Sequence, residues 1–244
     1  MNFLGIIPAR YASTRFPGKP LINIGGKTMI QRVYEQSEKS KSLKKVIVAT
    51  DDERIFEHVR SFGGNVIMTS DLHKSGTERC AEVVKNIDDV FDVIINIQGD
   101  EPFINPIQID LLCGCFNDPE TEIATLIKKI DIAEDLFNPN RPKVDVDENG
   151  FAKMFSRKPI PVINNVDEKL WLNERVFYKH IGIYGYKASV LQKICLLSEY
   201  PLEIKEKLEQ LRWLENDYKI KTAITEHEAI AIDTPEDLEK IAFK

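Results

Sequence analysis

Cysteine and histidine are scarce in this sequence, and those present are not spaced as metal ligands. Each residue type occurs four times among 244 residues. Only Cys113 and Cys115 lie close together along the chain, and no cysteine pair is accompanied by histidines at the spacing of a zinc site. We therefore expect Cys80, Cys113, Cys115 and Cys195 to be small apolar side chains of a reduced protein.

Long apolar runs and an excess of positive charge are also missing. No window approaches the about 18 apolar residues of a membrane span. Arg10, Arg15 and Lys19 interrupt the first 20 residues, so we expect a cytoplasmic protein without a signal peptide. The 33 Lys and Arg are outnumbered by 39 Asp and Glu, for a net charge of -6. Such a surface repels nucleic acid and anionic membrane, so we expect neither as a partner, and an anion site requires a local cluster of cations.

Two familiar phosphate-binding motifs are absent. The sequence contains no G-x-G-x-x-G. Gly26-Lys27-Thr28 resembles the end of a P-loop, but Leu21 stands where that motif requires its first glycine. We therefore do not interpret this segment as a phosphate site.

Over the first 120 residues, short runs rich in Val and Ile alternate with segments of helical period. The apolar runs at 3–8, 46–49, 66–68 and 93–97 predict strands, and the segments between them carry apolar residues at helical spacing. This alternation predicts an α/β fold with a mostly parallel central sheet and helices on both faces. Ligands of such sheets bind outside the carboxyl ends of the strands.

The pattern changes after about residue 120. Strands are expected at 123–130, 143–146, 152–155 and 176–186, then a helix at 204–214, a strand at 229–232 and a closing helix from Pro235. We interpret residues 1–244 as a single domain. Its nucleotide-binding core would comprise 1–120 and 205–244, and 121–204 would form a smaller β-rich portion laid over the sheet, for acceptor and dimer contacts.

Three cations lie in one loop directly after the first predicted strand. The stretch IIPARYASTRFPGKP contains Arg10, Arg15 and Lys19, and its prolines restrict the backbone. Solvated surface charges are the ordinary explanation for three cations in a loop. The position of these three, at the carboxyl end of a strand in an acidic chain, favours a rigid loop that wraps a polyphosphate.

Acidic residues follow two other apolar strands. Asp100 comes after the strand at 93–97, and Asp233 comes after the strand at 229–232. Carboxylates at this edge can hold Mg²⁺ between protein and phosphate oxygens. A turn or helix cap is the alternative for Asp100, whereas Thr234 already accounts for the helix start beside Asp233. Together with the basic loop, the two acids favour metal-assisted phosphoryl or nucleotidyl transfer.

Five sequence blocks, in their order and spacing, resemble the CMP-Kdo synthetases (3-deoxy-manno-octulosonate cytidylyltransferases) over nearly the whole chain. The blocks are IIPARYASTRFPGKPL, HKSGTER, NIQGDEP, FSRKPIP and, in the last third, HIGIYGYK with LEQLR and IDTPEDLE. The resemblance implies a Rossmann-like nucleotidyltransferase fold. It also implies a homodimeric cytoplasmic enzyme that uses CTP and Mg²⁺ to convert Kdo, an acidic eight-carbon sugar, into CMP-Kdo and pyrophosphate for lipopolysaccharide synthesis.

Two alternatives to this function stay open. The residues after FSRKPIP, VINN at 162–165, depart from the pattern of many family members. A cytidylyltransferase for the 8-amino analogue of Kdo, or for another acidic sugar such as a sialic acid, would share most of these blocks. A non-catalytic nucleotide-binding regulator is the alternative from a different class, and the presence of both Asp100 and Asp233 argues against it.

The resemblance also implies roles for individual residues. It places Arg10, Ser13, Arg15 and Lys19 around the CTP phosphates, the Ala9 backbone near the base, and Ser75, Gly76, Arg79 and Gln98 around cytosine and ribose. It assigns Asp100 and Asp233 to the metal, and Arg157, His180, Tyr184, Glu209 and Gln210 to the sugar-acid pocket. Arg10, Arg15, Lys19, Asp100 and Asp233 are the expected catalytic residues. From spacing alone His180 would be a core histidine, and Glu209 would belong to the solvated face of a helix.

Overall fold

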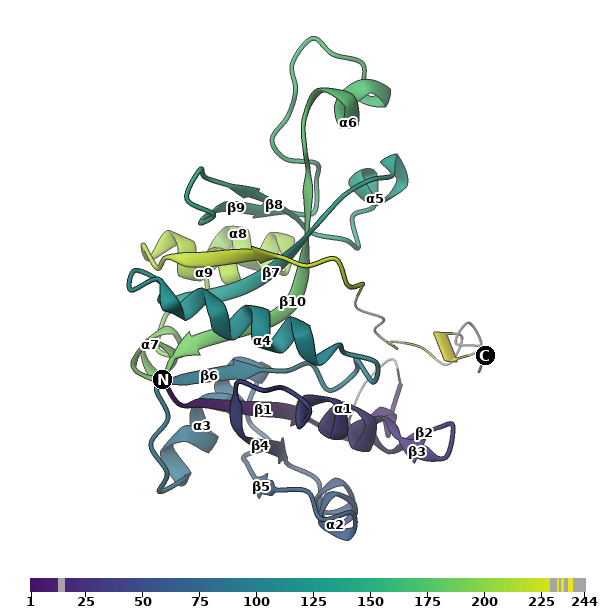
Figure 1. The fold of residues 1–244 in the computed structure, drawn as a ribbon, viewed down its shortest axis with the longest axis vertical. Helices are drawn as coiled ribbons and strands as arrows, with labels where there is room; N and C mark the ends of the chain where they lie inside the picture. Colours follow the sequence, from purple (N-terminus) through teal and green to yellow (C-terminus); the bar gives the residue numbers. More distant parts are fainter. Residues whose placement is uncertain (13–15, 229–231, 233, 235–236, 239–244) are drawn as a thin grey trace.

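A nine-stranded sheet with helices on both faces forms the centre of the molecule (Figure 1). The computed structural model describes residues 1–12, 16–228, 232, 234 and 237–238. Ser13, Arg15 and Asp233 lie outside the described residues, as do most of the strand predicted at 229–232 and most of the closing helix. The main sheet order is β11 (Ile220–Ile224), β7 (Ile123–Lys129), β10 (Tyr178–Lys187), β6 (Val93–Asn96), β1 (Phe3–Ala9), β4 (Leu43–Thr50) and β5 (Val66–Met68).

The half of the sheet formed by the first 100 residues is parallel, as the sequence predicts. Strands β6, β1, β4 and β5 run in one direction, and β11 is parallel to β7. Strand β10 is antiparallel to both of its neighbours, β6 and β7. A hairpin of β8 (Lys143–Val146) and β9 (Ala152–Ser156) joins the sheet through β10, and β2 (Asn23–Ile24) pairs with β3 (Lys27–Thr28) separately.

Helices cover the two faces because successive side chains of each strand point to opposite sides. Leu4 and Ile6 of β1 contribute to one buried core, and Ile7 and Ala9 contribute to the other. The first core packs against α3 (Gly76–Asn86), α7 (Ala188–Ile194) and α9 (Gln210–Glu215), and the second packs against α1 (Met29–Ser37), α2 (Glu53–Ser61) and α4 (Pro106–Gly114). The predicted α/β fold is therefore confirmed.

The remaining helices are short. They are α5 (Ala133–Phe137), α6 (Trp171–Glu174), α8 (Pro201–Glu206) and 3-10 turns at Lys19–Leu21, Cys115–Asn117 and Glu168–Leu170. Figure 1 shows α5 and α6 at one end of the long axis, and the β8–β9 hairpin lies toward the same end. None of the helices in the described ranges is both long enough and apolar enough to cross a membrane.

Three details of the sequence prediction need correction. The strand-rich segment 121–204 does not lie over the sheet, because its strands β7 and β10 are part of that sheet. The helix predicted at 204–214 is two helices, because Lys207 adopts a left-handed conformation with φ of 54° that ends α8. Strand β11 was not predicted: its five residues mix polar and apolar side chains, and its place in the sheet depends on parallel pairing with β7.

The four cysteines are free thiols, as expected. Cys80, Cys113 and Cys115 are buried, and Cys195 is partly buried. Burial raises the pKa of Cys113 to about 12 and that of Cys195 to about 11, so both stay protonated at neutral pH.

Candidate active site

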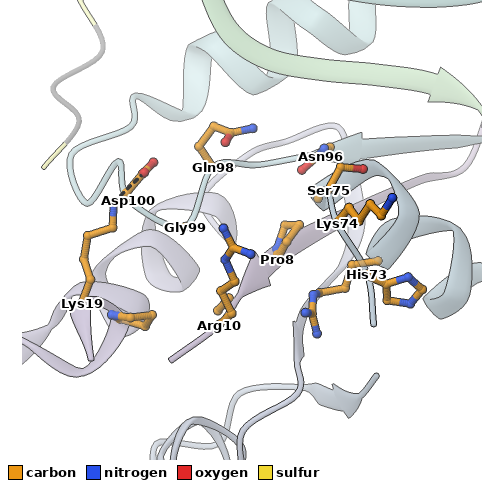
Figure 2. Close-up of a pocket in the computed structure, with 14 residues that line it drawn as sticks. Pro8, Arg10, Lys19, His73, Lys74, Ser75, Asn96, Gln98, Gly99 and Asp100 are labelled. Atoms are coloured by element: carbon orange, nitrogen blue, oxygen red, sulfur yellow. Dashed lines mark hydrogen bonds and ion pairs between the residues drawn. The ribbon is translucent and has the colours of Figure 1, made fainter. Parts of the chain in front are cut away.

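A cavity of about 260 Å³ lies at the carboxyl ends of β1 and β6. This is the edge of the sheet at which the sequence predicts ligand binding. The lining residues come from the ends of these strands, the loop after β1 and the first turn of α3 (Figure 2): Pro8, Ala9, Arg10, Lys19, Pro20, His73, Lys74, Ser75, Gly76, Arg79, Asn96, Gln98, Gly99 and Asp100.

The loop after β1 leaves the cavity and returns to it. Arg10 directly follows the strand, and Figure 2 shows its guanidinium pointing into the space between Pro8 and Gly99. The Gly18 N–H donates to the carbonyl of Tyr11 at 3.0 Å, which closes the loop. Gly18 has a φ of 74°, a conformation that other residues rarely adopt. The next residue, Lys19, is thereby brought back to the cavity.

An ion pair crosses one side of the cavity. Lys19 Nζ lies 2.8 Å from Asp100 Oδ2, and the two side chains are 14% and 29% exposed. The backbone N–H of Ile232 donates to the carbonyl of Asp100 at 3.0 Å. The residue that immediately precedes Asp233 in the sequence is therefore held against Asp100.

The ends of β1 and β6 are in direct backbone contact. A Cβ atom on Gly99 would lie 2.7 Å from the carbonyl oxygen of Pro8. Asn96, the last residue of β6, is buried below this contact and lines the cavity. The absence of a side chain at residue 99 thus allows Gln98 and Asp100 to reach the cavity beside Arg10.

The N-terminus of α3 supplies a further positive end. Ser75 caps the helix by accepting from the Glu78 N–H at 3.2 Å, and Gly76 begins it. A helix N-terminus attracts anions through its unpaired N–H groups and its dipole. With Arg10, Lys19 and Lys74 also lining the cavity and Asp100 as its acid, the site is suited to a polyanion.

Arg79 lines the cavity but is already paired. The residue is 3% exposed, and its guanidinium donates to Asp51 Oδ2 at 2.8 Å and to Thr69 Oγ1 at 2.5 Å. The Arg79 side chain is 4% exposed and that of Asp51 is 17% exposed. The ion pair fixes Arg79 between the cavity and the end of β4.

Four of the five residues predicted on the acceptor side lie on the sheet face covered by α9. Glu209 accepts a hydrogen bond from Thr77 of α3 at 2.9 Å and lines a second cavity, which shares Lys74 and Ser75 with the first. His180 Nε2 lies 3.0 Å from Thr125 Oγ1, and its ring contacts Tyr184 with centroids 5.2 Å apart. Burial lowers the pKa of His180 to about 3, so this ring is neutral at physiological pH.

Buried polar atoms without a partner gather around Tyr184. Within the described ranges, the Tyr184 hydroxyl, Gln210 Nε2 and Trp213 Nε1 are inaccessible and have no hydrogen-bond partner. The rings of Tyr184 and Trp213 are 5.1 Å apart, and Gln210 lies one turn before Trp213 on α9. Such atoms are costly unless water or a ligand satisfies them.

Arg157 is not part of this group. Its guanidinium donates to the carbonyl oxygens of Glu206 at 2.5 Å, Pro139 at 3.0 Å and Lys207 at 3.4 Å. Like His180, Tyr184 and Gln210, it lines neither of the two cavities. In this structure Arg157 connects β9 to the end of α8.

Several lining residues were not singled out from the sequence. They are Pro8, Pro20, His73, Lys74, Asn96 and Gly99. All but Pro8 and Pro20 belong to the blocks HKSGTER and NIQGDEP. These two blocks were therefore the sequence signal from which the other four residues could have been found. His73 contacts Glu82 and lies 3.8 Å from Glu78, and these contacts hold the loop before α3.

Comparisons with known proteins agree with one another over the whole chain. The model of a cytidylyltransferase family matches residues 4–221. The 3-deoxy-manno-octulosonate cytidylyltransferase of Parabacteroides distasonis is 57% identical over 100% of this chain and 98% of the relative, and that of Bacteroides thetaiotaomicron is 56% identical over 98% and 96%. A solved structure of CMP:2-keto-3-deoxy-manno-octonic acid synthetase complexed with CTP has a TM-score of 0.90 at 42% identity, covering 99% of this chain and 97% of that one.

Proposed function

This chain belongs to the cytidylyltransferase family, and we propose that it transfers CMP from CTP to the anomeric hydroxyl of Kdo and releases pyrophosphate. Relatives named for this activity are more than half identical over almost their full length. The observation that carries the proposal is the cationic cavity in which Arg10, Lys19 and the N-terminus of α3 converge beside Asp100.

We propose an orientation for CTP in this cavity from the charges of the lining residues. The triphosphate would contact Arg10 and Lys19, with Ser13 and Arg15 added from the part of the same loop outside the described residues. The base and ribose would then lie along the opposite wall. That wall consists of the Ala9 backbone, Ser75, Gly76, Gln98 and the buried Arg79.

Mg²⁺ is the metal that suits the donors present. Mg²⁺ is usually held by one or two carboxylates together with substrate phosphates. Asp100 presents a partly exposed carboxylate at the cavity, and no group of three acidic, His or Cys side chains forms a complete metal cage among the described residues. We therefore propose that Asp100 and Asp233 hold Mg²⁺ with the nucleotide. Bound there, the ion would neutralise phosphate charge and acidify the attacking hydroxyl.

The protein's own contribution is then positioning and charge neutralisation. The sugar hydroxyl attacks the α-phosphorus of CTP in line with the departing pyrophosphate. Arg10 and Lys19 line the cavity, where they would neutralise the charge that develops on pyrophosphate. Lys19 is held in place by Asp100 at 2.8 Å, so it exchanges an ion pair for a phosphate contact when nucleotide binds.

The acceptor would bind beside Glu209. Gln210 Nε2 and the Tyr184 hydroxyl are buried donors that lack partners, and they can satisfy carboxylate or hydroxyl oxygens of a sugar acid. Neutral His180 contacts the Tyr184 ring and fixes its orientation. The role of Arg157 in the acceptor pocket stays a prediction, and it requires release of the three carbonyl contacts described above.

We also propose that the protein is a homodimer that uses part of 121–204. The segment between β9 and β10 carries apolar side chains in water: Val162 is 64%, Leu170 48% and Val176 47% exposed. Exposed apolar groups on a projecting segment are typical of a contact with another chain. The division into core and acceptor portions stays a prediction.

The function is tested by pyrophosphate release from CTP with Mg²⁺ and one of three acceptors: Kdo, its 8-amino analogue or a sialic acid. We expect kcat/KM for Kdo to exceed that for each alternative by at least about tenfold, because a missing or altered polar contact changes discrimination by that much or more. Reactions without acceptor give the background rate. A higher kcat/KM with another sugar would make that sugar the acceptor in place of Kdo. If no pyrophosphate is released with any sugar, a non-catalytic regulator would be favoured.

A further inference from the structure

Glu209 is held by both of its carboxylate oxygens. Thr77 Oγ1 donates to Oε2 at 2.9 Å, and Arg212 NH2 donates to Oε1 at 3.3 Å. The Glu209 side chain is 28% exposed, so a ligand can still reach it. Burial raises the pKa of Glu209, whereas the bonds from Thr77 and Arg212 oppose that rise by stabilising the carboxylate.

Thr77 connects Glu209 to the central sheet. The residue is 3% exposed, and its hydroxyl lies 3.5 Å from the hydroxyl of Tyr186, a fully buried residue of β10. A hydroxyl has one proton to donate. Since the Thr77 proton goes to Glu209, Thr77 accepts from Tyr186, and a hydrogen-bonded chain runs from β10 through α3 to Glu209.

Arg212 holds the other side of the same carboxylate. Its NH2 group also lies 3.2 Å from Glu203 Oε1, and its NH1 group donates to the carbonyl of Leu197 at 3.0 Å. The side chain is 12% exposed. Arg212 thus fixes Glu209 relative to α8 and the loop after α7, both of which are distant in sequence from α3.

Together, Thr77, Glu209 and Arg212 lie beside both cavities of the candidate site. Thr77 directly follows Gly76, which lines the nucleotide cavity, and Ser75 lines both that cavity and the neighbouring cavity that Glu209 and Arg212 border. Gln210, with its unpartnered buried amide, directly follows Glu209. Any rotation of Glu209 would therefore move the boundary between the nucleotide and the acceptor.

We propose that Thr77 and Arg212 are positioning residues that fix Glu209 at the boundary between the two substrates and thereby set the affinity for the acceptor sugar. The inference rests on the proposed function, because it presumes that Glu209 faces the acceptor. A carboxylate held at both oxygens presents its remaining lone pairs in one direction, so sugar hydroxyls meet acceptors that are already oriented. Neither Thr77 nor Arg212 needs to touch the sugar.

The test compares Thr77→Val with Thr77→Ser. Valine has the shape of threonine but cannot donate, so Glu209 Oε2 and the Tyr186 hydroxyl both lose their partner. We expect KM for Kdo to rise about tenfold or more in Thr77→Val, because removing one partner of a buried charged hydrogen bond has an effect of this size. The Kd for CTP should change by less than about twofold, and Thr77→Ser should behave like wild type in both measurements.

A second comparison addresses the coupling between the two residues. Glu209→Gln should raise KM for Kdo, and adding Thr77→Val to it should produce little further change, because residues that act through one another are not additive. Arg212→Lys keeps the positive charge but loses the planar guanidinium and its several N–H donors. It should raise KM for Kdo by a smaller factor than Thr77→Val does.

The outcomes separate this inference from the proposed function. Equal rises in KM for Kdo and in Kd for CTP, or a lower Tm in Thr77→Val with unchanged kinetics, would overturn the positioning role and leave the activity established. A rise in KM for Kdo in Thr77→Ser equal to the rise in Thr77→Val would also overturn the positioning role. Wild-type protein that releases no pyrophosphate with any sugar would overturn both, whereas a preference for the 8-amino analogue changes only the sugar with which the comparison is made.

Discussion

Asp100→Asn should abolish turnover while leaving CTP bound. Asn has nearly the same shape as Asp but lacks the charge that a hard cation requires. We expect kcat to fall by at least about 1,000-fold, because bound metal supplies several kcal/mol of transition-state stabilisation. CTP binding without metal should be retained, because Arg10 and Lys19, which line the cavity, are unchanged and the substitution removes a negative charge beside the phosphates.

The matched control is Asp89→Asn. Asp89 lies before β6, at the opposite end of the strand from Asp100, and is 59% exposed in an ion pair with Lys45. A surface pair of this kind contributes at most about 1 kcal/mol to stability, so turnover should be unchanged. Steady-state rates and CTP titrations of both variants make the comparison, and turnover of Asp100→Asn near the wild-type rate would exclude the metal assignment.

Gly99→Ala should disable the site through the backbone. The new Cβ atom would lie 2.7 Å from the carbonyl oxygen of Pro8, and neither partner belongs to a flexible side chain. The ends of β1 and β6 must then separate, which shifts Arg10 relative to Asp100. We expect kcat/KM to fall by about 100-fold, since a displacement near 1 Å at a reacting centre has this effect. The free energy of unfolding should fall by about 1–3 kcal/mol, the usual cost of overpacking.

Gly114→Ala is the control for this substitution. Gly114 has an ordinary helical φ of -59°, and a Cβ atom there would meet nothing within 4 Å. Its replacement should leave kcat/KM unchanged and stabilise the fold by about 0.5–1 kcal/mol, since alanine loses less backbone entropy than glycine. Wild-type activity and unfolding in Gly99→Ala would show that the contact between the strand ends is not required.

The fold of the first 100 residues could be predicted because its signals are local. Apolar runs such as Val66–Met68 became strands with the predicted bounds, and Lys19 and Asp100 meet at the edge where parallel strands end. The α/β rhythm determines that edge, since the strands of the main sheet that precede residue 100 run the same way. A loop cation and a strand-end acid can therefore be placed at one edge of the sheet from sequence alone.

The other half depends on contacts that sequence periodicity does not record. Strand β10 lies between β6 and β7, and this placement results from long-range antiparallel pairing. The break at Lys207 gave no signal, because lysine is ordinarily a good helix former. The carbonyl contacts of Arg157 and the bond from Thr77 to Glu209 likewise join distant segments. For Arg157 and Glu209 the resemblance indicated a function, and only the structure gives their partners.

We propose that this chain joins CMP from CTP to Kdo in the cavity at the carboxyl ends of β1 and β6. Phosphorus NMR of wild-type protein with CTP, Mg²⁺ and Kdo tests it most directly, because it follows the α-phosphorus itself. We predict that the α-phosphate signal of CTP is replaced by a phosphodiester signal of CMP-Kdo and by pyrophosphate in equal amounts. Orthophosphate with CDP, or an unchanged CTP spectrum, would contradict the claim.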